Sequence, residues 1–272
     1  FVMGLIFFYA FHSLGQNIAI SDNPFEESIL REAQASLQRA VNFLTDRQLE
    51  NGSWCNEPAI TGLCVMAIHK SKTTQNKEIR EASVDKGRKY ILSFVQEDGS
   101  IWAKDRQKGY PNYSTAICLS TLAILNMEED YAVMKKARKF LIGSQYDEDN
   151  VENPTQKDNA FFGGIGYGSS GPGRPDLSNT QWALEALYLT EFLDKEPHSN
   201  DPKDAENSKL AWKNAVLFLS RVQNLPESND QVWVVKDKTD PNYGGFVYKP
   251  DESKSSAKFD DKQTLRSYGS MT

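Results

Sequence analysis

Apolar residues along this chain recur with the spacing of amphipathic helices, and one local pattern returns four times. Each copy places large apolar residues at i, i+3 and i+4 between charged residues, which is the stripe of a helix with one buried face. A glutamine follows five positions after the first large apolar residue of each copy, at Gln48, Gln96, Gln145 and Gln223. The successive separations are 48, 49 and 78 residues. Two nearly equal periods and one longer period predict an array of repeated units with an insertion in the third.

A turn of glycine and aromatic residues follows each glutamine, within residues 51–54, 98–102, 162–167 and 243–248. Glycine supplies backbone conformations that other residues avoid at the end of a helix. We expect the aromatic residue that follows to pack on the neighbouring unit. These turns therefore predict where the first helix of each unit ends.

A second type of helix is predicted after the turn, and it begins with a threonine in residues 61–68, 115–122 and 180–187. These segments are apolar or small on nearly every side, so we expect them to form a buried inner layer inside an outer layer of charged helices. A fourth inner helix is expected to open at Ser267 and to be cut off at Thr272, which predicts a chain that ends inside a repeat. The pattern predicts an all-α fold, either an open solenoid or a closed toroid.

The order of these motifs resembles the QW repeat of squalene and hopene cyclases and the related repeat of protein prenyltransferase β subunits. Residues 180–187, with the sequence TQWALEAL, resemble the matching inner helix of the cyclases. The resemblance implies an (α/α) toroid domain over residues 28–272, with at least four repeats and the last one truncated. It also implies an apolar, aromatic central cavity that binds or cyclises an isoprenoid such as squalene. Because this fold also serves as a non-catalytic scaffold, the alternative is an exported toroid that binds a protein or lipid partner.

The residues before Thr180 limit how far that chemistry carries over. The cyclase resemblance implies an Asp-x-Asp-Asp motif there, whose buried acid protonates an alkene. This chain has Asp176, Ser178 and Asn179 at those places, and serine is too weak an acid. The prenyltransferase resemblance implies a zinc-binding Asp-x-Cys pair, but Ser178 replaces the cysteine, so we expect no metal and no cofactor. Asp176 is either the N-terminal cap of the inner helix, which we favour, or a weak candidate for a catalytic carboxylate.

Aromatic residues near the predicted turns and inner-helix starts have two interpretations. The residues are Trp54, Trp102, Tyr113, Tyr167, Trp182 and Tyr248. In a structural role they stack between units and bury apolar area. In a functional role their ring faces line a pocket and stabilise cationic intermediates. Trp54 and Trp102 suit the structural role, whereas Tyr113, Tyr167 and Trp182 are the candidates for binding substrate.

Glycine-rich and polar segments complete the predicted organisation. Residues 163–173 lack the Gly-Lys-Ser/Thr ending of a phosphate loop and follow no predicted strand, so they form either a lid or a long turn. Arg174 beside them is either a surface residue or a contact for an anionic group. The polar residues 197–208 and 251–262 predict loops, which explain the longer third period.

Composition narrows the function classes. The 272 residues are 39% hydrophobic and 25% charged with a net charge of −6, which argues against a nucleic-acid partner because such a protein needs a basic surface. Cys64 and Cys118 occupy the same place in two inner helices, so we interpret them as small core residues. An exported chain would also permit one disulfide among these two and Cys55. The three histidines are scattered and predict no metal site.

The chain begins with an apolar run, Phe1 to Phe11, of the length found in the central region of a signal peptide. Ser13 and Gly15 then supply the small residues of a cleavage site before Gln16. We expect residues 1–16 to be signal-like and the protein to be periplasmic or secreted, with association at a membrane surface as a further expectation. The alternative is a hydrophobic helix docked on the body. Because the first residue is Phe1 and not Met, we expect the sequence to be either a fragment or a trimmed product.

Overall fold

The computed structural model describes residues 24–73, 76–105, 109–168, 174–255, 264–269 and 271. Over these residues the regular secondary structure is helical, and extended segments pair only in isolated bridges, such as those of Val95 with Ile101 and Gln223 with Phe246. The prediction of an all-α fold is therefore confirmed. The predicted signal-like segment, residues 1–16, and residues 169–173 of the glycine-rich segment lie outside the described residues.

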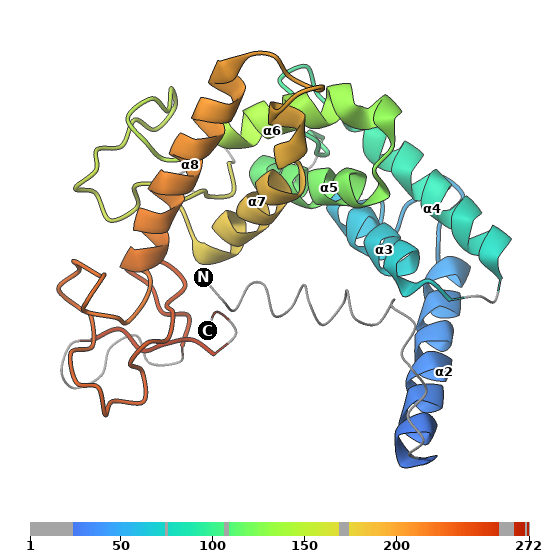
Figure 1. Cartoon of the computed structure of the whole chain (residues 1–272), viewed down its shortest axis with the longest axis horizontal. Helices are drawn as coiled ribbons and strands as arrows, with labels where there is room; N and C mark the ends of the chain where they lie inside the picture. The colour runs from blue at the N-terminus through green and yellow to red at the C-terminus, as the bar shows by residue number, and fades with distance from the viewer. Residues whose placement is uncertain are drawn as a thin grey trace.

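The helices follow one another along an arch, with α3, α5 and α7 on its inside and α4, α6 and α8 on its outside (Figure 1). In chain order they are α2 (Pro24–Asp46), α3 (Pro58–Ser71), α4 (Lys77–Leu92), α5 (Pro111–Leu125), the 3₁₀ helix η1 (Glu128–Asp130), α6 (Tyr131–Gly143), α7 (Leu177–Leu189), the 3₁₀ helix η2 (Glu191–Asp194) and α8 (Pro202–Arg221). Outer and inner helices therefore alternate along the chain. The first three units are α2 with α3, α4 with α5 and α6 with α7, and α8 begins the fourth.

Helix α5 lies at the centre of the hydrophobic core and packs on both α3 and α7. Apart from Tyr113, its residues from Pro111 to Leu122 are buried, as its apolar and small side chains require. Gly62 on α3 permits a close approach, since a Cβ atom there would lie 2.7 Å from Oγ1 of Thr121. The burial expected of an inner helix is thus observed for α5, whereas Ile60 and Leu63 on α3 and Tyr188 on α7 are exposed.

A threonine near the start of each inner helix fixes the turn that precedes it. Its buried hydroxyl oxygen accepts a hydrogen bond from a backbone N–H of that turn. The pairs are Trp54 N to Thr61 Oγ1 at 3.1 Å, Ile101 N to Thr115 Oγ1 at 2.8 Å and Ile165 N to Thr180 Oγ1 at 2.9 Å. This recurring bond explains why the three inner-helix sequences align on threonine.

The glutamines are not equivalent in all units, which corrects the predicted register. In three units Nε2 donates to the carbonyl of the turn glycine at 2.8–2.9 Å, from Gln48 to Gly52, from Gln145 to Gly163 and from Gln223 to Gly244. Gln96 donates instead to the carbonyls of Phe94 at 2.7 Å and Trp102 at 3.2 Å. In that unit an isolated bridge joins Val95 to Ile101, whereas in the fourth unit it joins the glutamine to Phe246. Val95 is therefore the structural equivalent of Gln223, and Ile101 that of Phe246. The second unit is thus shifted by one residue relative to the predicted alignment.

Two buried arginines connect the outer layer to the turns that follow the inner helices. Nε of Arg88 on α4 donates to Asp130 of η1 at 2.7 Å. Nε of Arg138 on α6 donates to Asp194 of η2 at 2.8 Å. Equivalent arginine–aspartate ion pairs therefore occur in the second unit and in the third unit.

The predicted fourth inner helix at Ser267 is wrong for the described residues, because residues 264–269 are not helical. The backbone N–H of Ser267 donates to Oδ1 of Asn242 at 2.9 Å, and that of Tyr268 donates to the carbonyl of Phe246 at 2.7 Å. Since contacts to the preceding turn take up these backbone groups, the segment lies against that turn without forming a helix.

The predicted polar loop 197–208 is also corrected, because α8 begins within it at Pro202. Asp201 caps the helix by accepting a hydrogen bond from the backbone N–H of Lys203 at 2.9 Å. Proline in the first turn costs no hydrogen bond, since the N–H groups there lack helical partners. Asp201 and Pro202 thus mark the start of a helix at a place where the lack of apolar residues predicts a loop.

Candidate functional site

Aromatic rings from two inner helices and two turns meet near the N-terminal ends of α5 and α7. The rings of Tyr113 and Trp182 lie 6.5 Å apart, and those of Tyr113 and Tyr167 lie 5.9 Å apart. Tyr110 lies 4.8 Å from Tyr167, whose hydroxyl is 3.4 Å from that of Tyr248. These five residues are called the aromatic cluster below. It includes Tyr113, Tyr167 and Trp182, the residues that the sequence analysis proposes for substrate binding.

Asn112 positions the turn that carries Tyr167. Its backbone N–H donates to the carbonyl of Tyr167 at 3.3 Å, and its side-chain Nδ2 donates to the carbonyl of Gly166 at 2.9 Å. Gly168 lies directly against the Asn112 side chain at a φ of +72°, which favours glycine. The turn of the third unit is therefore anchored to the first turn of α5.

Sequence reasoning did not single out Tyr110, which the structure places in the aromatic cluster. Tyr110 precedes Pro111 at the start of α5 and lies three residues before Tyr113. Because Tyr110 is the non-helical residue before the first turn of α5, the spacing rule for helices gave no signal for it. Tyr248 belongs to the cluster through the turn of the fourth unit, and no periodic pattern connects it with α5.

Asp176 is the N-terminal cap of α7, as the sequence analysis favours. Its Oδ1 accepts the backbone N–H of Asn179 at 2.9 Å, and its Oδ2 accepts Nδ2 of the same residue at 2.7 Å. Burial raises the pKa of Asp176 above its ordinary value, and the bonds from Asn179 oppose that rise. Both carboxyl oxygens are thus already engaged in holding the start of the helix.

Replacing Asp176 with alanine is expected to lower the free energy of unfolding by about 1–3 kcal/mol at neutral pH, because it removes a cap and leaves buried donors of Asn179 unpaired.

Asp176→Asn removes the charge while keeping a good capping residue. Since burial raises the pKa of Asp176, the folded protein binds this proton more tightly than the unfolded chain does. The wild type should therefore lose stability relative to Asp176→Asn as pH rises from 3.8 through the raised pKa. Urea unfolding across this window tests this, and a pH-independent difference would contradict it.

Lys254 at the edge of the aromatic cluster and Arg174 over the ring of Phe161 already have acidic partners. Nζ of Lys254 lies 4.7 Å from the ring centroid of Tyr248 and 3.1 Å from Glu252. Arg174 forms an ion pair with Asp251. Burial raises the pKa of Tyr248 and of Tyr113, so both phenols stay protonated near neutral pH. The cluster therefore offers ring faces and phenol hydroxyls rather than an ionised acid or base.

The remaining aromatic and cysteine positions have structural roles. Trp54 is buried, and its Nε1 donates to the carbonyl of Leu44 at 2.9 Å. Trp102 is half-buried beside Ser100.

Cys118 is buried in α5, where burial raises its pKa to about 12, so it stays a thiol. Burial also raises the pKa of the half-buried Cys64 to about 11. The interpretation of Cys118 as a core residue is confirmed.

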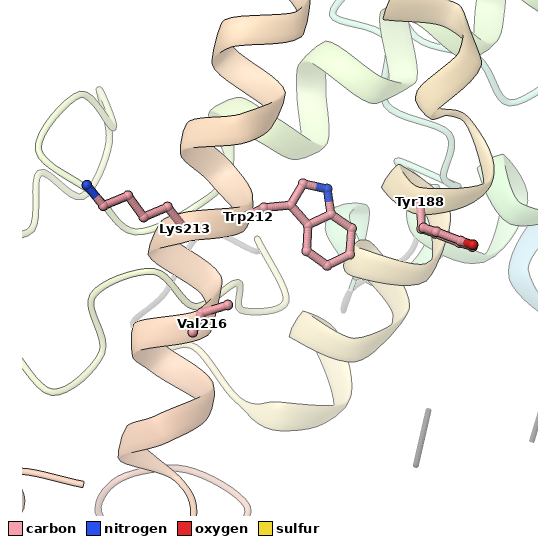
Figure 2. Close-up of a pocket in the computed structure, with 4 residues that line it drawn as sticks. All are labelled: Tyr188, Trp212, Lys213 and Val216. Carbon is pink, nitrogen blue, oxygen red and sulfur yellow. The ribbon is translucent and has the colours of Figure 1, made fainter. Parts of the chain in front are cut away.

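An apolar groove of about 300 Å³ lies between α7 and α8, apart from the aromatic cluster. Tyr188, Trp212, Lys213 and Val216 line it. Figure 2 shows Trp212 directed from α8 toward α7, while the Lys213 side chain extends to the other side of α8. Trp212 therefore provides a second accessible tryptophan against which variants of the cluster can be compared.

Two features were not found in the described part of the chain, a cluster of metal-ligating side chains and a helix able to span a membrane. No group of three or more His, Cys, Asp or Glu side chains there could hold a metal ion. Among the same residues, no helix has both the length and the apolar character needed to cross a bilayer.

Comparison of the sequence with protein-family models and with curated proteins gave no match.

Proposed function

We propose that this protein is part of an (α/α) toroid of the cyclase and prenyltransferase repeat kind, and that its aromatic cluster binds an unsaturated apolar chain such as an isoprenoid. Alternating outer and inner helices along an arch support the toroid (Figure 1). The predicted export of the protein, with or without association at a membrane surface, belongs to the same proposal. The ligand would enter from the side of the arch where α5 and α7 begin.

The convergence of half-buried rings carries this proposal. Tyr113, Tyr167 and Trp182 come from two helices and a turn. The centroid of the Tyr113 ring nevertheless lies 5.9 Å from that of Tyr167 and 6.5 Å from that of Trp182. None of the three side chains is fully buried. A hydrocarbon chain lying on them would remove apolar area from water at a gain of about 25 cal/mol per Å². Ring faces also attract the electron-poor edges of a ligand.

The arrangement supports binding rather than cyclisation. Protonation of an alkene requires a strong, buried acid with a free proton to give. The carboxyl oxygens of Asp176 hold the start of α7, and the residue two positions later is Ser178. The phenols of Tyr113 and Tyr248 have raised pKa values and are poorer acids than free tyrosine. We therefore propose that the ligand leaves the described site chemically unchanged.

Titration with an isoprenoid alcohol such as farnesol, followed by isothermal calorimetry, tests the proposal. Tyr113→Ala and Trp182→Ala should each weaken binding about tenfold or more, the equivalent of about 1.4 kcal/mol. Trp212→Ala changes a tryptophan outside the cluster and should retain the wild-type affinity. Chromatography of the recovered ligand should return farnesol alone. Equal affinity of the Trp182→Ala and wild-type proteins would contradict the proposal, as would a cyclised product.

A non-catalytic scaffold is the second candidate, and the apolar groove between α7 and α8 favours it. Its lining of Tyr188, Trp212 and Val216 would suit the apolar side of a protein or lipid partner. The two candidates differ in the residues they require. If no isoprenoid binds and Trp212→Ala, but not Trp182→Ala, loses a partner captured by the wild type, the scaffold function is favoured.

A further inference from the structure

Three polar side chains lead from the buried start of α7 to the aromatic cluster, and we call them the polar relay. They are Asp176, Tyr248 and Tyr167. Asp176 is the inner end and is 2% exposed. Burial raises its pKa, and a side-chain hydrogen bond with Tyr248 is among the interactions that oppose the rise. The backbone N–H of Leu177 donates to the carbonyl of Tyr248 at 2.9 Å, which keeps Tyr248 beside Asp176. The hydroxyl oxygens of Tyr248 and Tyr167 lie 3.4 Å apart.

Asp176 sets the direction of the hydrogen bonds along the polar relay. Above its raised pKa, Asp176 is an ionised carboxylate, which accepts hydrogen bonds and has none to donate. The Tyr248 hydroxyl therefore donates its proton to Asp176. The Tyr248 oxygen then remains as an acceptor, and Tyr167 donates to it. The lone pairs of the Tyr167 oxygen are thus left at the outer end of the relay.

The outer end of the polar relay is the part that a ligand can reach. Tyr167 is half-buried, and its ring lies 5.9 Å from that of Tyr113 and 4.8 Å from that of Tyr110. Within the described part of the chain, the Tyr248 hydroxyl is the hydrogen-bond partner of the Tyr167 hydroxyl. A ligand lying on these rings covers the Tyr167 oxygen. A covered acceptor without a donor is unfavourable, so the ligand has to supply the donor.

Charges around the polar relay argue against an ionic end group on the ligand. A diphosphate would lie near the carboxylate of Asp176, while Arg174 and Lys254 already form ion pairs with acidic neighbours. An ammonium group would be repelled by Lys254, whose Nζ lies 4.7 Å from the ring centroid of Tyr248. A neutral hydroxyl group supplies a hydrogen-bond donor without either penalty.

We infer that the polar relay selects a ligand whose apolar chain ends in a neutral hydroxyl group, and that this hydroxyl donates to the Tyr167 oxygen. The selection rests on the proposed function, because it concerns the polar end of the molecule that the aromatic cluster binds. It narrows the ligand class to an isoprenoid alcohol. A hydrocarbon, an ether or a diphosphate with the same chain would bind more weakly.

Calorimetric titration with ligands that share one chain tests this selection. Farnesol carries the donor, whereas farnesyl methyl ether keeps the chain and the oxygen but only accepts hydrogen bonds. The wild type should bind farnesol about tenfold more tightly than the ether, because the ether leaves the Tyr167 oxygen without a donor. Farnesyl diphosphate should also bind more weakly than farnesol.

The outcomes separate the selection from the proposed function. Equal affinity for farnesol and its methyl ether, or tighter binding of the diphosphate, would overturn the selection while the aromatic cluster still binds an isoprenoid chain. Failure of all three ligands to bind would overturn both.

Two conservative variants distinguish the polar relay from a steric effect of the extra methyl group. Tyr167→Phe keeps the ring and should lower the ratio of farnesol to ether affinity about tenfold, through weaker binding of farnesol. Tyr248→Phe removes the acceptor for the Tyr167 proton, so that proton becomes free to bond to a ligand. Tyr248→Phe should therefore bind the ether more tightly than the wild type does. A loss of packing would not produce this gain.

Tyr243→Phe is the matched control, because Tyr243 lies outside the aromatic cluster and its hydroxyl donates to Glu227 at 2.7 Å. It should retain the wild-type ratio of affinities. Circular dichroism should report the same helix content for all three variants. An unchanged ratio in both Tyr167→Phe and Tyr248→Phe, or the same change in Tyr243→Phe, would show that the polar relay does not select the end group.

Discussion

Replacing Arg138 with methionine is expected to lower the free energy of unfolding by about 3–5 kcal/mol, because it leaves a desolvated carboxylate without its partner. The Arg138 side chain is 2% exposed and that of Asp194 is 10% exposed. The guanidinium also donates to Thr190 Oγ1 at 2.7 Å and to Ser208 Oγ at 2.8 Å. One side chain therefore joins α6, the end of α7, η2 and α8, and its loss affects all of them.

Urea unfolding followed by circular dichroism measures this effect. Lys89→Met is the control, because Lys89 forms an ion pair with Asp85 at 2.7 Å on an exposed face of α4. Exposed pairs of this kind contribute about 0–1 kcal/mol. A double variant, Arg138→Met with Asp194→Leu, should recover part of the lost stability, since no buried charge then lacks a partner. If Arg138→Met costs no more than Lys89→Met, the interpretation of this pair as a structural connection is wrong.

The repeated helices could be predicted from sequence because their cause is local. Apolar spacing and the threonine at the start of each inner helix reflect contacts within one unit, such as the bond from Ile101 N to Thr115 Oγ1. The register of the second unit could not be predicted, because Gln96 retains the motif while Val95 holds its structural place. The arginine ion pairs were also missed. Arg138 and Asp194 lie 56 residues apart, and no local pattern connects them.

The aromatic cluster was predicted in part for a similar reason. Tyr113 and Trp182 lie close to the threonines that start two inner helices, and neighbouring inner helices bring their starting ends together. Tyr110 and Tyr248 depend on how the preceding segment and a later turn fold, so their distances from Tyr167 could not be derived from spacing. The cap role of Asp176 was predictable, because capping involves only the first turn of α7.

The turn glycines permit a second large effect to be predicted, since two of them share a backbone conformation but differ in their surroundings. Gly163 has a φ of +85°, and a Cβ atom there would lie 1.8 Å from the carbonyl oxygen of Asn214 on α8. Gly244 has a φ of +81°, and a Cβ atom there would meet nothing within 4 Å. Alanine at either position adds the strain of a left-handed conformation, about 1–2 kcal/mol. At Gly163 it also forces α8 away from the turn, which costs about another 1–3 kcal/mol.

Gly163→Ala should therefore lower the free energy of unfolding by about 2–5 kcal/mol, and Gly244→Ala by about 1–2 kcal/mol. Both variants carry the same backbone strain, so it cancels when their free energies of unfolding are subtracted. The remaining difference measures the steric cost of the contact between the turn and α8. Gly52 and Gly99 lie against the next outer helix in the same way, with a Cβ atom 2.5 Å from the carbonyl oxygens of Lys86 and Lys136. Alanine at these positions should thus resemble Gly163→Ala rather than Gly244→Ala in urea unfolding. Equal effects at Gly163 and Gly244 would mean that the turn does not set the distance between successive units, and the arch would need another physical cause.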